Sequence, residues 1–176
     1  ARDIASAGIA WHPLRYHKAP SGLATAFDIM QGIIVGVWLC VRYKIKIIHA
    51  RSYVSSVIAL TLKKLFNVKY IFDMRGFWAD EKLLNGGWPP DGRMYRLAKG
   101  FERRFLLEAD HVVSLTHAAV TEIQRFPYLQ GHMPSVTVIP TCADLARFKP
   151  ITRERGDAGL VIGYVGSVGR YMFDEV

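Results

Sequence analysis

The chain has 176 residues, of which 51% are hydrophobic, and this excludes an intrinsically disordered protein while allowing one well-buried domain. It carries 23 Lys and Arg against 15 Asp and Glu, a net charge of +8 that favours an anionic partner such as phosphate, nucleic acid or an acidic membrane surface. Its two cysteines show no CxxC spacing, which argues against disulfide or metal frameworks and fits a reducing cytoplasm.

The first fifty residues predict a strand, a long helix and a second strand. Residues 8–14 favour a short strand, and a basic turn then leads to Ser21, a good N-cap for a helix over residues 22–42. The apolar run within that helix is shorter than the about 20 residues of a membrane span, so we expect a core helix. Residues 44–50 are β-branched, as in a buried parallel strand.

The remainder of the first 150 residues continues the alternation. Residues 75–92 are rich in Gly, Pro and Trp and predict an irregular loop with one helical turn. The expected helices and strands are a helix over 52–66 stopped by Asn67, a strand over 68–73, a basic amphipathic helix over 93–109, a strand over 111–115, a helix over 117–126 and a strand over 136–139. The alternation predicts an α/β fold: a doubly wound, Rossmann-like parallel sheet with helices on both faces.

The last part of the chain predicts a joint between two sheet domains. A Pro-led linker ends near Pro150, and an apolar strand over residues 160–165 follows. We therefore expect a domain over residues 1–150 and the start of a second over 151–176, within a longer protein. Gly166 and Ser167 follow the last strand, where backbone N–H groups could approach a phosphate, although the pattern is neither a full GxGxxG nor a Walker loop.

Basic side chains follow several of the predicted strands. In parallel α/β sheets, ligands bind beyond the carboxyl ends of the strands. Arg could bind phosphate there through its planar fork of donors, and His could orient a sugar hydroxyl. The alternative for each is a side chain tied to a nearby carbonyl. The candidates are His12, His49, Arg51, Arg75 and His117.

Carboxylates and aromatic side chains gather near the same predicted edge. Asp73, Asp80 or Glu81 could act as a base if its surroundings raised its pKa, but Asp73 could equally cap a turn or pair with Arg75. Aromatic side chains in the loop could stack on a sugar, insert at a membrane interface or pack on the core. They are Phe77, Trp78 and Trp88.

The helix over residues 93–109 is basic. A solvated face is the usual meaning of such a run, and contact with an anionic membrane is the alternative. The residues concerned are Arg93, Arg96, Lys99, Arg103 and Arg104.

Several segments together resemble family 4 (group 1) glycosyltransferases of the GT-B fold. They are IIHARS at 47–52, IFDMRGFW at 71–78, Glu102 followed by EADHVVSLT at 108–116, VIPTCADLARF at 138–148 and IGYVGS at 162–167. The segment at 138–148 is similar to the family's interdomain signature, with Thr141, Cys142 and Ala143 in place of its Asn-Gly-Val. The resemblance covers most of the chain from about Lys44 onward.

The resemblance implies that residues 1–150 are the N-terminal, acceptor-binding half of a GT-B fold. It implies transfer of a hexose from a nucleotide sugar to a hydroxyl with retention, by an enzyme whose catalytic residues are not assigned here. Gly166 and Ser167 would belong to the donor-phosphate loop. We expect the chain alone to be inactive, because most of the donor domain would lie downstream. The implied acceptor-binding candidates are His12, His49, Arg51, Arg75, Trp78, Glu81 and His117.

No cofactor and no metal are expected, since no Asp-x-Asp cluster occurs. The implied partners are a nucleotide-sugar donor, a carbohydrate or lipid-linked acceptor and the C-terminal domain of the same chain, with no nucleic acid. The expected location is cytoplasmic, with peripheral membrane contact through Arg93, Arg96, Arg103 and Arg104. Two alternatives are a nucleotide-sugar 2-epimerase of the same architecture and a non-catalytic basic domain that binds a membrane or a partner.

Overall fold

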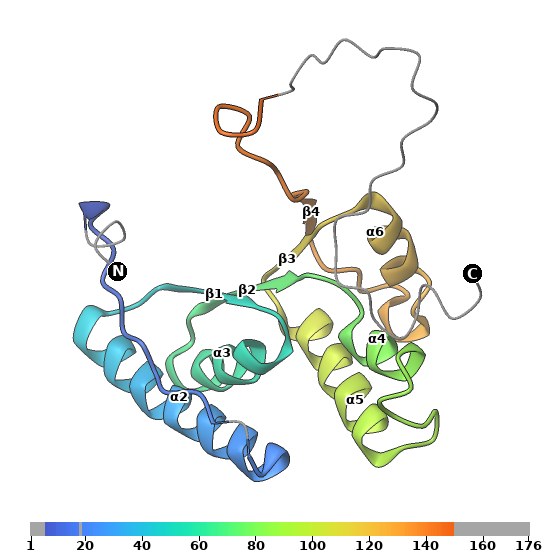
Figure 1. The fold of residues 1–176 in the computed structure, drawn as a ribbon, viewed down its shortest axis with the longest axis horizontal. Helices are drawn as coiled ribbons and strands as arrows, with labels where there is room; N and C mark the ends of the chain where they lie inside the picture. The colour runs from blue at the N-terminus through green and yellow to red at the C-terminus, as the bar shows by residue number, and fades with distance from the viewer. Residues whose placement is uncertain (1–5, 18, 150–176) are drawn as a thin grey trace, which may run out of the picture.

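The computed structural model describes residues 6–17 and 19–149, which form a four-stranded parallel sheet and a layer of helices (Figure 1). The strands are β1 (Ile47–Arg51), β2 (Lys69–Met74), β3 (His111–Ser114) and β4 (Val136–Val138). The helices are α2 (Ser21–Tyr43), α3 (Tyr53–Phe66), α4 (Trp78–Leu84), α5 (Arg93–Glu108), α6 (His117–Gln124) and the 3-10 turn η1 (Pro127–Leu129). The parallel α/β class predicted from the sequence is confirmed.

The strands lie side by side in chain order, β1-β2-β3-β4, and all three pairs are parallel. Ala50, Phe72, Val112 and Val136 occupy one register row across the sheet. Since side chains in one row point to the same face, this row and the rows two residues away define the apolar face of the sheet.

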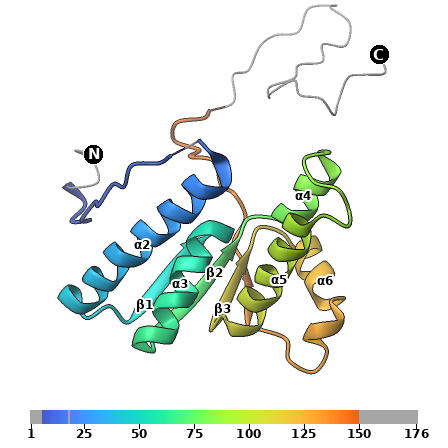
Figure 2. The same cartoon turned by 90° about the horizontal axis from the view of Figure 1, so that it is seen from below.

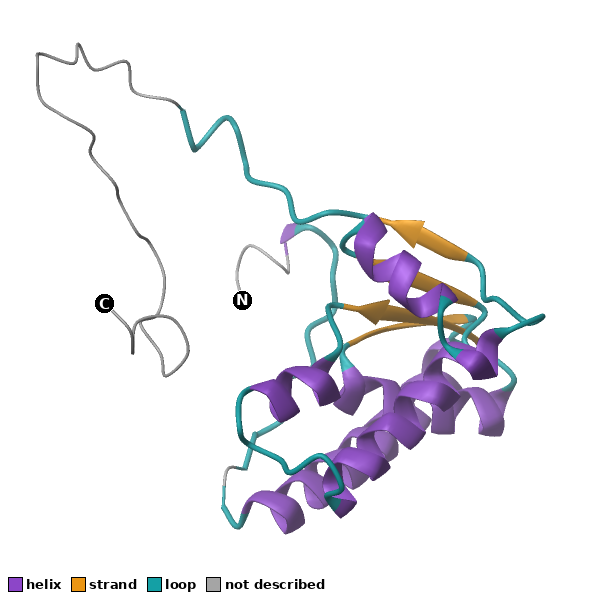
Figure 3. Ribbon diagram, turned by 90° about the vertical axis from the view of Figure 1, so that its right-hand side faces the viewer, coloured by secondary structure: helices purple, strands orange, loops and turns teal. Residues whose placement is uncertain are grey.

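One face of the sheet holds the core. Its buried cluster joins Phe72 of β2 and Val112 of β3 to side chains of three helices, Leu60 of α3, Phe105 of α5 and Ile123 of α6. Connections between neighbouring parallel strands are right-handed, so a sheet built in chain order receives all its crossover helices on the same side. The expectation of helices on both faces is therefore not met in the described chain, where the helices lie on one side of the strands (Figures 1 and 3).

Helix α2 packs against α3 through two glycines. A Cβ at Gly36 would lie 2.6 Å from Leu62 Cδ1, and a Cβ at Gly32 would collide with Ile58 Cδ1, so a larger residue at either position would force these side chains of α3 to shift. The opposite side of α2 leaves large apolar side chains exposed, so the predicted core helix is buried on one side only. By length and apolar composition, Gly22–Tyr43 could also cross a membrane, a test that helices of soluble proteins pass as well.

The strand predicted over residues 8–14 is wrong, because this segment has no strand partner and runs as an irregular stretch beside α2. The ring of His12 packs on Trp38 with 5.8 Å between centroids, and Nδ1 of His17 lies 2.6 Å from Asp28 Oδ1. The helix begins at Ser21 itself, with Pro20 in the N-cap position that was predicted for Ser21.

Two further expectations need correction. β1 was expected to be buried, but it is the edge strand of the described sheet, and Ile47 is 60% exposed. The loop predicted over residues 75–92 contains α4, a longer helix than the single turn expected. Asn67 ends α3 as predicted, with a left-handed φ of 52° that asparagine tolerates well.

Asp110 ties the start of β3 to β2 and α3. Its carboxylate accepts hydrogen bonds from Lys63 Nζ at 2.6 Å, Lys69 Nζ at 2.9 Å and the Tyr70 N–H at 2.8 Å. Burial would raise the pKa of Asp110, but these donors outweigh it and hold the pKa well below its usual range. The EADHVV segment thus has a structural role at the amino edge of the sheet. The candidate site is expected at the opposite edge, where the strands have their carboxyl ends.

Replacing Asp110 by asparagine is expected to lower the free energy of unfolding by about 2 kcal/mol at pH 7, because charge-assisted hydrogen bonds are lost. A carboxyl group whose pKa falls on folding stabilises above its unfolded pKa, about 3.9, and this contribution fades as the pH falls toward the folded value. Urea unfolding of both proteins at pH 7 and pH 3 should therefore show a gap that narrows in acid. Glu108→Gln, which removes a partly exposed pair with Lys64, is the control and should change little.

Candidate functional site

Two polar hollows lie at the carboxyl edge of the sheet, where β1 and β2 end. The open-face hollow, of about 310 Å³, is lined by His49, Arg51, Asp73, Val113, Leu115 and the segment Ile139–Cys142. The loop hollow, of about 260 Å³, is lined by Ser52, Tyr53, Arg75, Gly76, Trp78 and Glu81. The two are neighbours because Arg51 precedes Ser52, whose N–H donates to the Asp73 carbonyl at 3.0 Å.

The open-face hollow is built around Asp73. This residue shares a register row with Arg51 and Val113, on the sheet face that the core does not use. Its carboxylate lies 3.2 Å from His49 Nε2 and 3.8 Å from Arg51 Nε. The carboxylate is nearly buried, at 12% exposure, whereas the side chains of His49 and Arg51 are more than half exposed. The nearly buried Asp73 carboxylate thus holds the side chains of His49 and Arg51, which are exposed to solvent.

The loop hollow is lined by a cation, Arg75, and a carboxylate, Glu81. Arg75 follows β2 directly, and Glu81 comes from α4, which folds back so that Glu81 reaches Gly76. A Cβ at residue 76 would collide with the Glu81 carboxylate, so a larger residue there would displace the end of the Glu81 side chain. The pair can bind a polyhydroxy ligand through complementary donors and acceptors.

Ser52 joins the two hollows through an unusual backbone conformation. Its φ of 72° with ψ of 179° lies in a region that is almost restricted to glycine. Its carbonyl accepts hydrogen bonds from the hydroxyl groups of Ser55 at 3.1 Å and Ser56 at 2.7 Å, and these bonds hold the turn. The bend directs the chain from β1 into α3 at the place where Arg51 and Tyr53 must point into different hollows.

The structure brings together five of the seven predicted acceptor residues and leaves two aside. His49 and Arg51 line the open-face hollow, and Arg75, Trp78 and Glu81 line the loop hollow. His12 packs on Trp38, in the half of α2 that leads toward the amino end of β1, so its placement at a strand end is wrong. His117 begins α6 at the carboxyl end of β3 and is exposed, outside the lining of both hollows.

The aromatic side chains of the loop pack on one another. The ring of Trp78 lies 5.4 Å from Tyr53 and 5.0 Å from Trp88, centroid to centroid, and Phe77 lies 5.9 Å from Phe126. Of the three alternatives left open by the sequence, packing on the core describes these contacts. Trp78 still lines the loop hollow.

Sequence reasoning missed a buried charge cluster beneath α4. Lys99 Nζ donates to Asp80 at 3.0 Å and also to Glu102, which is fully buried and accepts a second hydrogen bond from the Tyr53 hydroxyl. Tyr95 donates to Asp80 at 2.8 Å. Asp80 is therefore engaged with α5, away from the hollows, and Lys99 is not part of the exposed basic face predicted for it.

Burial raises the pKa of Glu102, although hydrogen bonds from Lys99 and Tyr53 oppose this. Burial would lower the pKa of Lys99, but the hydrogen bonds with Glu102 and Asp80 outweigh it and raise the pKa overall. A usable signal was present in the sequence: Lys99 and Glu102 fall on the side of the helix that carries Ala98 and Phe105, both buried. The cluster fastens α4, and with it Glu81, to α5.

The basic residues of α5 divide into two groups. Arg96 and Arg104 line a groove with Leu97, Gly100 and Phe101. Arg103 lies on another side of the helix, with its guanidinium carbon 5.4 Å from the centre of the Tyr128 ring. Arg93 is exposed at the start of α5. The single basic face expected from the sequence is thus split.

The described residues do not test two other expectations. Gly166, Ser167 and the proposed second domain over 151–176 lie outside them. Within residues 6–17 and 19–149, no three His, Cys, Asp or Glu side chains gather as metal ligands would. The absence of a metal from the reaction stays a prediction.

Comparison with known proteins shows which family the domain with this edge belongs to. A family model described as "Glycosyl transferase 4-like domain" matches residues 1–142, which include both hollows up to Cys142 and all the described strands. A comparison with curated proteins found no match.

Proposed function

Since the chain belongs to the glycosyl transferase 4-like family, we propose that it forms the acceptor-binding half of an enzyme that transfers a hexose from a nucleotide sugar to a hydroxyl. The proposal includes retention of the anomeric configuration. The acceptor would be a polysaccharide, a glycolipid or a similar molecule. One observation supports it most: Arg51, His49 and Arg75 converge with Asp73 and Glu81 on the carboxyl edge, where α/β sheets bind ligands.

In this proposal residues 1–150 bind the acceptor, and residues 151–176 begin a donor-binding domain with Gly166 and Ser167 at its phosphate loop. The segment Ile139–Cys142 borders the open-face hollow and leads toward that domain. The donor would therefore lie above the hollow, within reach of Arg51. An arginine there can neutralise the charge of the leaving diphosphate.

The role of the hollows would be to position the acceptor. Arg75 and Glu81 can hold hydroxyl groups of a sugar, and His49, oriented by Asp73, can hold the hydroxyl that reacts. Positioning and charge neutralisation together can lower the barrier without a covalent intermediate on the described residues. The enzyme would work in the cytoplasm, and the exposed Arg93, Arg96 and Arg104 would favour contact with an anionic membrane.

Titration of a panel of nucleotide sugars into the 176-residue chain and into a longer form carrying a complete second domain tests this proposal. We expect turnover or tight binding by the longer form and little by the chain, measured as heat and as released nucleotide. Tight binding by the chain alone would contradict the assignment of roles. Consumption of the sugar nucleotide without an acceptor would instead favour the 2-epimerase, and no turnover by the longer form would favour a binding domain.

A further inference from the structure

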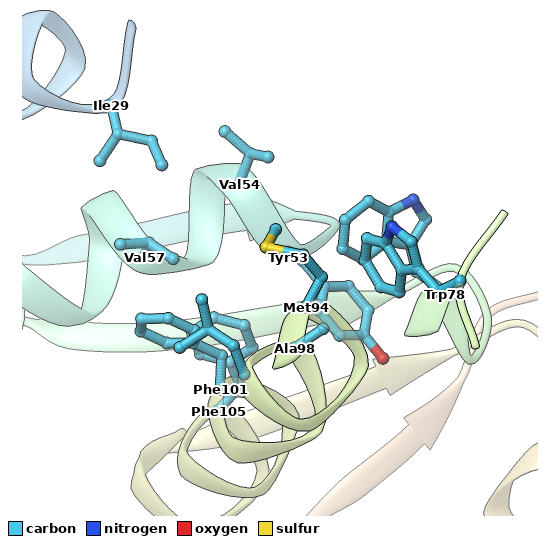
Figure 4. Close-up of a pocket in the computed structure, with 11 residues that line it drawn as sticks. Ile29, Tyr53, Val54, Val57, Trp78, Met94, Ala98, Phe101 and Phe105 are labelled. Carbon is cyan, nitrogen blue, oxygen red and sulfur yellow. The ribbon is translucent and has the colours of Figure 1, made fainter. Parts of the chain in front are cut away.

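An apolar cavity lies directly behind the loop hollow. It has a volume of about 120 Å³ and is bordered by α2, α3, α4, α5 and the loop around Trp88. Its lining residues are all apolar or aromatic, and Figure 4 shows Ile29, Val57, Phe101 and Phe105 among them. The hydroxyl of Tyr53, the polar group of that ring, is engaged by Glu102.

The cavity opens to the surface. Val54, Met94 and Leu97 line it and are 44%, 53% and 54% exposed. An apolar cavity of about 150 Å³ stays dry and binds a molecule as large as benzene. A cavity of this size and chemistry can therefore take a short stretch of hydrocarbon from outside.

The cavity and the loop hollow share two walls. Tyr53 and Trp78 line both spaces, so a polar chamber with Arg75 and Glu81 adjoins an apolar one. Leu97 and Phe101 in turn connect the cavity to the groove that holds Arg96 and Arg104. A ligand with a polar head and a hydrocarbon chain matches the first two of these surfaces, and the arginines of the groove lie beside the apolar one.

Resting on the proposed function, we infer that the acceptor is amphiphilic, with a sugar head in the loop hollow and its hydrocarbon chain in the apolar cavity behind Trp78. The arginines of the groove, beyond the apolar cavity, then face the phosphate groups of the surrounding bilayer. Trp78, which lines both spaces, would contact the head and the chain. This assigns an acceptor class to the site and a binding role to Trp88, Met94 and Leu97.

The test uses glucose and a series of alkyl β-glucosides from methyl to hexyl, each below its micelle concentration, titrated into the 176-residue chain. Binding is followed by tryptophan fluorescence. We expect the dissociation constant to fall by about fourfold for each methylene group that enters the cavity, with glucose the weakest ligand. Equal affinity along the series would overturn the inference.

Variants distinguish binding of the alkyl chain in the cavity from unspecific binding to exposed apolar surface. Val54→Phe should fill the mouth and Trp88→Ala should remove a wall, so both should flatten the dependence on chain length. Leu84→Ala is the matched control, because Leu84 is 78% exposed on α4 and lies outside the cavity lining. Near-ultraviolet circular dichroism checks that Val54→Phe retains its packing. A chain-length dependence that survives in both cavity variants contradicts the inference.

The two proposals can fail separately. Transfer to water-soluble acceptors with no gain from an alkyl chain would leave the glycosyltransferase proposal standing and remove the amphiphilic acceptor. A chain-length dependence without any sugar-nucleotide turnover by the longer form would contradict the proposed function and leave a hydrocarbon site without an acceptor role.

Discussion

Replacing Lys99 by methionine is expected to destabilise the protein by about 3–5 kcal/mol at neutral pH, because it leaves a buried carboxylate without its cation. Glu102 is fully buried, and Lys99 is the basic partner that its carboxylate has in the described structure. The Tyr53 hydroxyl remains as a donor but carries no charge. Equilibrium unfolding in urea at pH 7 measures the loss.

The loss of unfolding free energy caused by Lys99→Met should depend on pH. Burial already raises the pKa of Glu102 above its ordinary 4.5, so the folded state binds this proton more tightly than the unfolded chain. Such a group stabilises below its unfolded pKa, and the contribution is lost as the pH rises through the folded value. Without Lys99, the pKa of Glu102 in the folded protein rises further. The loss of unfolding free energy should therefore be largest near neutrality and become smaller in acid.

Lys82→Met is the control for Lys99→Met, since Lys82 is an exposed lysine on α4 that loses the same charge. Its unfolding free energy should stay within about 0.5 kcal/mol of the parent. Equal losses in the two variants, or a Lys99→Met deficit that does not change between pH 7 and pH 4.5, would mean that the buried cluster does not stabilise the α4–α5 contact.

Replacing Asp73 by asparagine is expected to lower kcat/KM of the complete enzyme by about 100-fold, the scale of misplacing a reacting group by an ångström. The Asp73 carboxylate accepts from His49 and lies beside Arg51, whereas an amide offers one accepting oxygen and two N–H groups that repel those donors. Initial rates against acceptor concentration, with the melting temperature of both proteins, separate positioning from stability.

Asp91→Asn, an exposed substitution in the loop before α5, is the matched control and should leave the rates unchanged. A normal kcat/KM in Asp73→Asn would remove the open-face hollow from the active site. A fall in rate that tracks a large drop in melting temperature would assign Asp73 a purely structural role.

The fold was largely predictable because its signals are local. Asn67 stops α3, and the short apolar runs of β2 and β3, each between two helical segments, are typical of strands in a parallel sheet. Which side a helix covers is not local: it depends on strand order, which periodicity does not reveal. The failed strand at 8–14 has the same cause, since a strand needs a partner and this segment has none among the described strands.

The site was predictable at the strand ends and unpredictable elsewhere. The carboxyl-end rule found Arg51 and Arg75 because a strand fixes where its last residue points. It failed for His12, whose strand did not form. Asp80 and Lys99 are far apart in sequence, and only the packing of α4 on α5 shows that they neutralise each other.

The order of the strands also bears on how the chain acquires its structure during synthesis. Each strand of the described sheet pairs with the next one to be made, so no strand must wait for a distant partner. Pairing each strand with the next one in sequence keeps the intervening segment as short as the crossover helix allows, which limits the loop-closure cost. On a ribosome, β1, α3 and β2 could dock first and receive β3 and β4 in turn. The sheet can thus grow from one edge at the pace of translation.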